Sequence, residues 1–368
     1  MDKNIKKITG GGTYNTFNSN KIKRENNMDL LKIISCILVI MTHVSASYVI
    51  KYLEIGTYKF SVGNFYDSLS RIAVPIFVMI AGKYALSDDK NKNFKEYYKK
   101  IFKRIYIPTI IWSILYVSYS MILKILAELI KGKEVNYLGP VKEFILGKPF
   151  YHLWYLYMMI GLYLLVPFLI KIKEKYGENK FFKLGVIFIF IGLGLIIFQE
   201  FLFKINFYER DDIFKYLKYY WYFSQFQFLN FIGYFILGYS LKNKIINIKK
   251  STLTYLLSLF FLWLIVEKTK KLFFYDNNFI FVVIGAISFY LIFNNLKINY
   301  NFSKLEKHTF NIYLVHAGVL SVISLFLNEI LNYEPNPIWY IPFGIILVFL
   351  LSLIFSICLE KILYKVKK

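Results

Sequence analysis

Long apolar runs separated by short charged stretches make up most of the chain. Ten runs approach the roughly 20 residues that an α-helix needs to cross about 30 Å of hydrocarbon. The pattern therefore predicts an all-α protein, a polytopic transmembrane bundle of about ten spans. The spans are expected at residues 30–50, 69–86, 105–130, 153–170, 184–203, 223–241, 252–266, 279–296, 310–327 and 338–360.

The loops between these runs differ in their content of basic residues. The N-terminal segment and the alternate loops on its side carry 29 Lys and Arg residues, whereas the loops on the other side carry 13. Because basic loops stay on the cytoplasmic side, the bias predicts a multi-pass protein of the plasma membrane with both termini cytoplasmic. The polar segment 1–27 is expected to be a disordered cytoplasmic arm, followed by one transmembrane domain over 28–368.

Composition agrees with a membrane protein. The 368 residues are 57% hydrophobic and 20% aromatic, and the formal charge is +23. In a soluble protein this charge would indicate nucleic-acid binding. Basic loops that flank membrane spans explain it here, so we expect the lipid bilayer and no nucleic acid as a partner. Cys36 and Cys358 both lie in apolar runs, which argues against a disulfide framework.

The first apolar run carries three ionisable residues, Asp29, Lys32 and His43. Eleven helical residues turn about 1100°, so Lys32 and His43 share a face, about 16 Å apart along the axis. Asp29 is one turn before Lys32 and can pair with it. Ionisable groups in hydrocarbon are costly, so this face is expected to meet protein or a wet cavity. The alternative is an interfacial Asp–Lys pair with a hydrogen-bonded core histidine.

The second run places Arg71 near its outer end, at the predicted depth of His43. Two interpretations are open for this arginine. It either shares a polar pocket with His43 or is an ordinary interfacial residue.

A basic run precedes the third span. Lys103 and Arg104 follow Lys100 at spacings of three and four, so they can share one helical side with it. Such a patch can hold the phosphates of a cofactor. It can equally anchor the helix to anionic lipid head groups.

Two further stretches carry histidines beside aromatic residues. His152, Trp154 and Tyr155 stand at an expected outer boundary, where the pattern is typical of an aromatic belt. Tyr313 and His316 lie one turn apart in the inner half of the ninth span. His316 is interpreted either as a pocket residue or as a structural core histidine.

The predicted outer loop 204–228 is rich in Tyr, Trp and acidic residues. Aromatic faces and carboxylates can bind sugars, but the pattern favours an amphipathic belt helix. The chain has no P-loop, dinucleotide fingerprint, HExxH or GxSxG motif. Its four histidines are scattered without metal-ligand spacing, so no metal is expected.

Taken in order, several of these blocks resemble the acyltransferase-3 superfamily of membrane O-acyltransferases. The resemblance covers residues 28–316 and makes 28–368 a single acyltransferase domain. It implies transfer of an acyl group from cytoplasmic acyl-CoA (acetyl-CoA or succinyl-CoA) to a hydroxyl of an extracytoplasmic polysaccharide or lipid-linked sugar. The blocks are MDLLKIISCILVIMTHVS, RIAVPIFVMIAGKYAL, KRIYIP, HLWYLYMMIGLYLLVPFL and NIYLVH.

The resemblance also implies roles for individual residues. Lys32 and His43 match a basic residue, usually Arg, and a histidine that are important for activity in the family. Lysine lacks the bidentate fork of arginine. The second span reads Ala81-Gly82, whereas the family commonly has Ser-Gly, so any role of that hydroxyl is absent.

Further matches extend the implied site. The basic motif before the third span corresponds loosely to Lys100, Lys103 and Arg104, expected to bind the CoA phosphates. The family's Tyr-x-x-His corresponds to Tyr313 and His316, which join Trp154 as expected pocket residues.

A mechanism can be written from these candidates. A hydroxyl needs a positioned base at neutral pH, and His43 is the candidate. Lys32, Arg71 or a backbone group can stabilise the oxyanion, with Asp29 as the partner of Lys32. Two rival functions share the buried charges: a polysaccharide or small-solute transporter, and a non-catalytic subunit of a cell-wall complex. The residues leave open the acceptor, the acyl group, a covalent acyl-enzyme and the oligomeric state.

Overall fold

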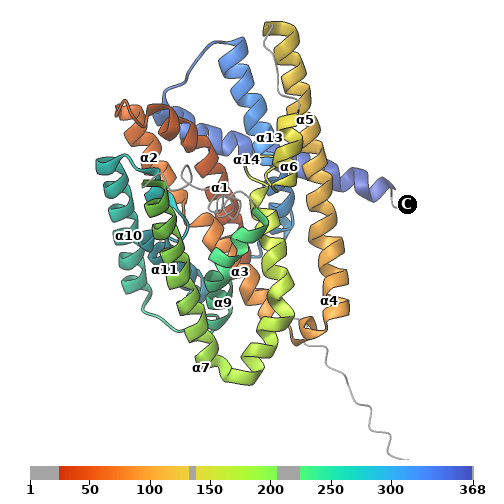
Figure 1. Cartoon of the computed structure of the whole chain (residues 1–368), viewed down its shortest axis with the longest axis vertical. Coiled ribbons are helices and arrows are strands. Elements are labelled where there is room, and N and C mark those ends of the chain that lie inside the picture. The colour runs from red at the N-terminus through yellow and green to blue at the C-terminus, as the bar shows by residue number, and fades with distance from the viewer. Residues whose placement is uncertain (1–24, 132–137, 205–223, 367–368) are drawn as a thin grey trace, which may run out of the picture.

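Helices and the short segments between them make up the described structure. The computed structural model describes residues 25–131, 138–204 and 224–366, and no strand occurs in these ranges (Figure 1). The predicted all-α class is confirmed. The long helices are α1 (Asn26–Tyr52), α2 (Tyr58–Ser70), α3 (Ala73–Ser87), α5 (Ile107–Lys131), α7 (Trp154–Lys204), α10 (Ile248–Thr269), α11 (Ile280–Asn295), α13 (Thr309–Leu325) and α14 (Pro337–Val366).

Short helices connect or extend the long ones. They are η1 (Asp89–Lys92), α4 (Phe94–Ile101), the π-helix η2 (Phe102–Tyr106), α6 (Leu138–Ile145), η4 (Ser224–Phe231), α9 (Ile232–Ser240), η5 (Leu272–Tyr275), α12 (Ser303–Glu306) and the π-helix η6 (Phe326–Ile330). The segments 1–24 and 205–223 lie outside the described residues. The predicted disordered arm and most of the predicted belt loop therefore stay predictions.

Eight stretches within the described ranges are long and apolar enough to cross a membrane. One of them contains the break in α7 at Gly177, whose φ of 79° and ψ of 165° are not helical. Glycine adopts a positive φ without a steric penalty, and α7 folds back there into two arms (Figure 1). If the two arms of α7 are counted separately and the shorter η4–α9 segment is added, the eight stretches become ten. This agrees with the prediction of about ten spans.

The bundle has two ends, named here as they stand in Figure 1. The lower end holds the start of α1 at Asn26 and the turn of α7 at Gly177, and the upper end holds the end of α1 at Tyr52. At the lower end Lys173 Nζ donates a hydrogen bond to the Leu86 carbonyl over 2.9 Å, which ties α3 to the turn of α7.

Two glycines allow α3 and α9 to pack backbone against backbone. A Cβ atom on Gly82 would lie 1.9 Å from the Phe235 carbonyl oxygen, and one on Gly238 would lie 1.9 Å from the Met79 carbonyl oxygen. Small residues permit such close approach between membrane helices. The glycine of the Ala81-Gly82 pair is thus required by packing.

The prediction of an outer loop over residues 51–68 was wrong for its second half. Residues 58–70 form α2, which continues towards α3 and packs on α1. Asn64 and Asp67 of this helix face the protein interior. Their side chains lower the hydropathy of the segment, although Phe60 packs in a core cluster with Val266. Because these polar residues make contacts inside the protein, the hydropathy pattern did not predict this buried helix.

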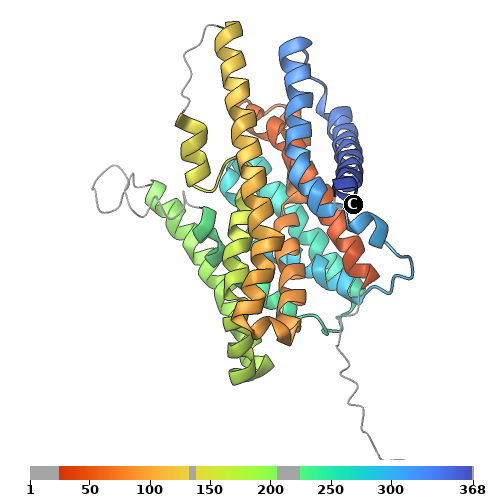
Figure 2. The same ribbon diagram turned by 90° about the vertical axis from the view of Figure 1, so that its right-hand side faces the viewer.

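The last helix crosses the bundle at a steep tilt (Figure 1). Its Tyr340 packs against Tyr48 near the end of α1, with ring centroids 6.1 Å apart. Farther along, Glu360 pairs with Lys307, next to the start of α13, over 2.8 Å. Helix α14 therefore runs from the upper end towards the lower one. On another side α5 and α13 stand together along much of their length (Figure 2).

Candidate active site

Three of the four histidines gather in the interior although the sequence scatters them. His43 comes from α1, His152 from the segment before α7, and His316 from α13. The His43 and His316 rings stack with centroids 5.3 Å apart, and His152 meets His316 edge-on at 5.0 Å. His316 was expected in the inner half of its span, away from the outer residues, but it lies beside both other histidines.

Hydrogen bonds fix the tautomers of two of these rings. His316 Nδ1 lies 2.6 Å from the Tyr313 carbonyl oxygen, and His152 Nε2 lies 3.3 Å from the Leu314 carbonyl oxygen. A carbonyl only accepts hydrogen bonds, so each of these nitrogens carries the proton. The lone pairs therefore lie on His316 Nε2 and His152 Nδ1. Both are buried without a hydrogen-bond partner among the described residues.

His43 opens onto a cavity of about 140 Å³, termed the histidine cavity. Arg71, His152, Trp154 and Tyr313 also line it. The interpretation that Arg71 shares a polar pocket with His43 is thus supported by placement. Trp154 and Tyr313, proposed as pocket residues, lie in the wall as well, while His316 stands behind His43.

Arg71 is held rigidly at the wall of the histidine cavity. Its guanidinium donates to the carboxylate of Asp67, a fully buried residue one turn earlier, and its Cζ lies 4.1 Å from the ring centroid of Tyr275. Arginine keeps its charge when buried. The cavity therefore combines imidazole lone pairs with one fixed positive charge.

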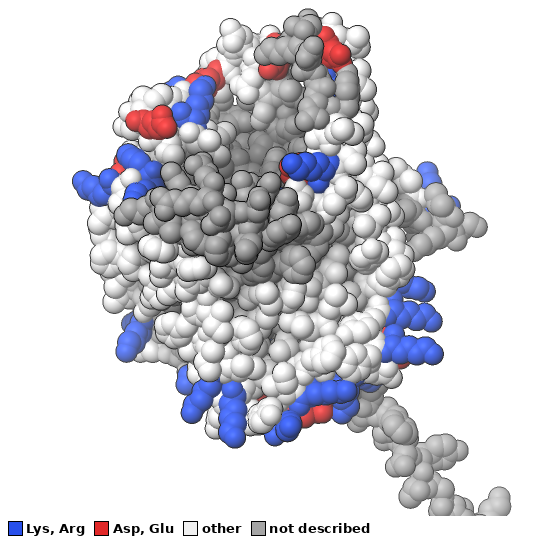
Figure 3. Space-filling view, viewed as in Figure 1, with Lys and Arg blue, Asp and Glu red and all other residues white. Residues whose placement is uncertain are grey.

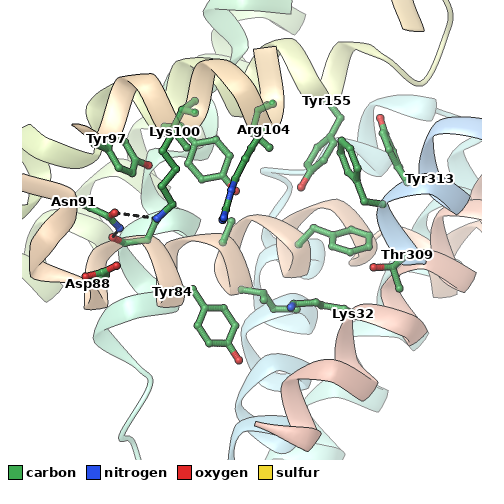
Figure 4. A pocket seen from close by; sticks show the side chains of 18 of the residues that line it. Lys32, Tyr84, Asp88, Asn91, Tyr97, Lys100, Arg104, Tyr155, Thr309 and Tyr313 are labelled. Atoms are coloured by element: carbon green, nitrogen blue, oxygen red, sulfur yellow. Dashed lines mark hydrogen bonds between the residues drawn. The ribbon is translucent and has the colours of Figure 1, made fainter. Parts of the chain in front are cut away.

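A larger cavity of about 470 Å³, termed the basic cavity, is shown in Figure 4, and α4, which lines it, lies towards the lower end in Figure 1. Lys32 of α1, Lys100 of α4 and Arg104 of η2 all line it. Lys100 Nζ donates to Asn91 Oδ1 over 3.3 Å, which directs it along the cavity wall. Lys103 is exposed and is not among the lining residues, so two of the three predicted phosphate ligands point into this space.

Lys32 lies in the basic cavity and not beside His43. Its Nζ is 2.6 Å from Glu306 Oε1 and 3.9 Å from Asp29 Oδ1. Asp29 is buried and lines neither cavity. The expected Asp29–Lys32 pair is present, but the closer partner is Glu306. This placement separates Lys32 from the reaction envisaged at His43.

The two cavities share one layer of aromatic side chains. Phe77, Tyr155 and Tyr313 line both. Tyr155 and Tyr313 lie with ring centroids 5.4 Å apart, and Figure 4 shows them together at one end of the basic cavity. The Tyr313 hydroxyl donates to the His152 carbonyl. A chain-like molecule that entered the basic cavity would reach His43 by displacing these rings.

Sequence reasoning missed three members of the site. His152 was assigned to an aromatic belt, and neither Asp67 nor Glu306 was singled out. One signal was available, because a buried charge in a membrane needs a partner of opposite sign. Among the described residues, no three His, Cys, Asp or Glu side chains are grouped to hold a metal ion.

The fold and cavities define a helical membrane protein with a buried histidine cluster next to a basic chamber. The profile of the acyltransferase domain family matches residues 25–357, and the chain belongs to that family. It is therefore a membrane acyltransferase, and the resemblance seen in the sequence is confirmed. No curated protein and no solved structure matches the chain.

Proposed function

We propose that the enzyme moves an acetyl or succinyl group from acyl-CoA at the lower end to a sugar hydroxyl at the upper end. The acceptor is a surface polysaccharide or a lipid-linked sugar. The observation that carries the proposal is the shared aromatic layer between the basic cavity and the histidine cavity. It lets a donor bind on one side of the bundle while its thioester reacts near the other.

The basic cavity suits the donor. Lys100 and Arg104 supply cations for the CoA phosphates, with Lys32 deeper along α1. Lys32 and His43 are about 16 Å apart along a helix axis. An extended pantetheine arm bridges a distance of that order. The thioester then lies past Tyr155 and Tyr313, in the histidine cavity.

The histidine cavity suits acyl transfer. His43 takes the proton of the acceptor hydroxyl, and the oxygen attacks the thioester carbonyl to form the ester. The C–S bond breaks, and the CoA thiolate leaves and takes up the proton. Arg71 stabilises the negative oxygen of the tetrahedral intermediate. The ring of His316 stacks behind His43, with centroids 5.3 Å apart, and holds the His43 imidazole at the cavity wall.

The enzyme is proposed to lie in the plasma membrane with its lower end facing the cytoplasm. Lys and Arg side chains gather along the lower rim of the face in Figure 3, with a smaller group at its upper left, and the described surface between them is largely uncharged. The loop bias of 29 to 13 basic residues points the same way. Acyl-CoA is a cytoplasmic metabolite, so this orientation delivers it to the basic cavity.

Orientation can be checked with single cysteines in a chain whose Cys36 and Cys358 are replaced by serine. Glu54→Cys, at the exposed upper end, should react with an impermeant maleimide on intact cells. Lys95→Cys, exposed at the lower end, should react only after permeabilisation. The opposite labelling pattern would reverse the sidedness of the mechanism. The predicted loop residue Asn64 is unsuitable because it is buried.

The donor site can be checked by replacing Lys100 and Arg104 together with glutamine. The KM for acetyl-CoA should rise about tenfold or more, since each lost phosphate contact weakens binding by on the order of 1 kcal/mol. The measurement is the initial rate of transfer from labelled acetyl-CoA in membranes with matched protein content. Lys103→Gln is the control because it removes a charge from the same segment but outside the cavity. Equal rises in both variants would assign the basic run to membrane anchoring.

A further inference from the structure

The helix that carries Arg71 holds its side chain from one side alone. The guanidinium donates to the carboxylate of Asp67, one turn earlier in α2, while Arg71 Nε is buried without a hydrogen-bond partner among the described residues. This single contact does not fix the plane of the guanidinium. A group that stabilises an oxyanion has to be oriented before the negative charge develops. The orientation of Arg71 therefore depends on residues outside α2.

Tyr275 of η5 supplies the second contact. The Arg71 Cζ lies over its ring, 4.1 Å from the centroid, an arrangement in which a guanidinium gains a cation–π contact. The tyrosine is buried in an apolar cluster that also contains Val49, Phe60 and Val266. Its ring is thus a surface against which the guanidinium can rest, provided that the ring itself is held in place.

The hydroxyl of Tyr275 is held by an amide on α2. It donates a hydrogen bond to Asn64 Oδ1 over 2.5 Å, and Ser68 Oγ donates to the same oxygen over 3.0 Å. The Asn64 amide nitrogen donates to the Trp263 carbonyl over 3.2 Å and to Glu267 Oε2 over 2.8 Å. A side-chain amide has two donors and two acceptor lone pairs, so Asn64 uses its full capacity. It cannot rotate without losing these bonds, and Tyr275 is fixed with it.

Glu267 joins this network to α10. Its Oε1 accepts a hydrogen bond from Ser61 Oγ over 2.7 Å and lies 3.0 Å from Lys270 Nζ. Hydrogen bonds to an ionised carboxylate are stronger than those between neutral groups. The network therefore ties α2, α10 and η5 together, and it ends at the ring on which Arg71 rests.

We propose that Tyr275, held by Asn64 and Glu267, is a positioning residue that directs the Arg71 guanidinium into the histidine cavity. The inference rests on the proposed function and adds the residues on which its oxyanion stabilisation depends. Arg71 lines the histidine cavity, whereas Tyr275, Asn64 and Glu267 are not among its lining residues. They act through Arg71 and not on the substrate. A misplacement of about 1 Å in such a group can lower a rate by about 10²-fold.

Two variants of Tyr275 separate the ring from its tether. Tyr275→Leu removes the ring but keeps an apolar side chain in the cluster, so kcat should fall about 10- to 100-fold. Tyr275→Phe keeps the ring and loses one hydrogen bond, so kcat should fall about three- to tenfold. The KM for acetyl-CoA should not change in either variant, because the contact of Arg71 with the oxyanion exists in the transition state alone.

The measurement is the initial rate of transfer from labelled acetyl-CoA, divided by the amount of the protein in the membranes. Phe274→Leu is the matched control. It removes a neighbouring aromatic ring of η5 that packs on the same apolar cluster but meets Phe279 edge-on, with centroids 5.0 Å apart. Its kcat should stay at the wild-type value.

A background without the arginine provides the decisive comparison. Added to a chain with Asp67→Asn and Arg71→Met, either change at Tyr275 should leave kcat as it is, since the residue through which it acts is gone. A wild-type kcat for Tyr275→Phe, or the same fold-loss in both backgrounds, would overturn the proposal. Tyr275→Phe preserves the packing volume, so it decides the question even if Tyr275→Leu does not accumulate. A wild-type chain that consumes no acetyl-CoA in the presence of glycan would instead refute the proposed function.

Discussion

Replacement of His43 by alanine is expected to lower the rate of acyl transfer by about 10²- to 10⁴-fold, the usual effect of removing a general base. His43 lines the histidine cavity, whereas the fully buried His316 stands behind it. Of the two stacked rings, the His43 imidazole is therefore the one that can contact the acceptor hydroxyl. The measurement is transfer from labelled acetyl-CoA to a glycan fraction in membranes matched for protein content.

A glutamine variant makes the test specific for proton transfer. His43→Gln keeps a hydrogen-bonding side chain but has no group that takes a proton at neutral pH, so it should fail as His43→Ala does. His308→Gln is the matched control: its Nδ1 lies 2.9 Å from Ser356 Oγ, and it lines neither the basic nor the histidine cavity. Near-normal transfer by both His43 variants would contradict the general-base role and leave the histidine cluster with a structural role only.

The span pattern predicted the fold well because hydrocarbon imposes a simple rule on composition. Runs of about 20 apolar residues appear as helices in the structure, and the all-α bundle follows from them. The rule failed at α2, where the buried polar residues Asn64 and Asp67 have polar partners inside the protein. Asp67 accepts a hydrogen bond from Arg71. Asn64 Nδ2 donates to Glu267 Oε2 of α10 over 2.8 Å. Hydropathy does not detect such a helix, because its polar residues face protein and not water.

Helical geometry predicted part of the site. The shared face of Lys32 and His43 is real, but the 16 Å between them places one residue in each cavity. The spacing of two residues within one helix does not show which cavity each of them lines. That depends on α4 and η2, which bring Lys100 and Arg104 to Lys32.

Long-range proximity explains what the sequence did not yield. His152 and His316 are far apart along the chain, and their contact depends on how the segment before α7 packs on α13. The carbonyls of Tyr313 and Leu314 fix both tautomers, a backbone effect with no sequence signature. The resemblance to the family pointed to His316 but not to His152.

Arg71 offers the second large effect, and its buried partner decides how to test it. Arg71→Met alone would leave Asp67 as an uncompensated buried carboxylate, which typically destabilises a protein by about 3–5 kcal/mol. Such a variant would report on folding and not on catalysis. The informative variant is the double replacement Asp67→Asn with Arg71→Met, which removes both charges.

The double variant is expected to accumulate normally but to lose about 10²- to 10³-fold in kcat, the range seen when one oxyanion-stabilising group is removed. The KM for acetyl-CoA should stay close to the wild-type value, because a contact made in the transition state alone affects kcat. Asp67→Asn by itself retains the cation, stacked on Tyr275, and should lose far less. Rates of transfer from labelled acetyl-CoA in membranes of equal protein content separate these cases. A double variant with wild-type kcat would show that Arg71 only anchors α2 and that the oxyanion is stabilised by another group in the histidine cavity.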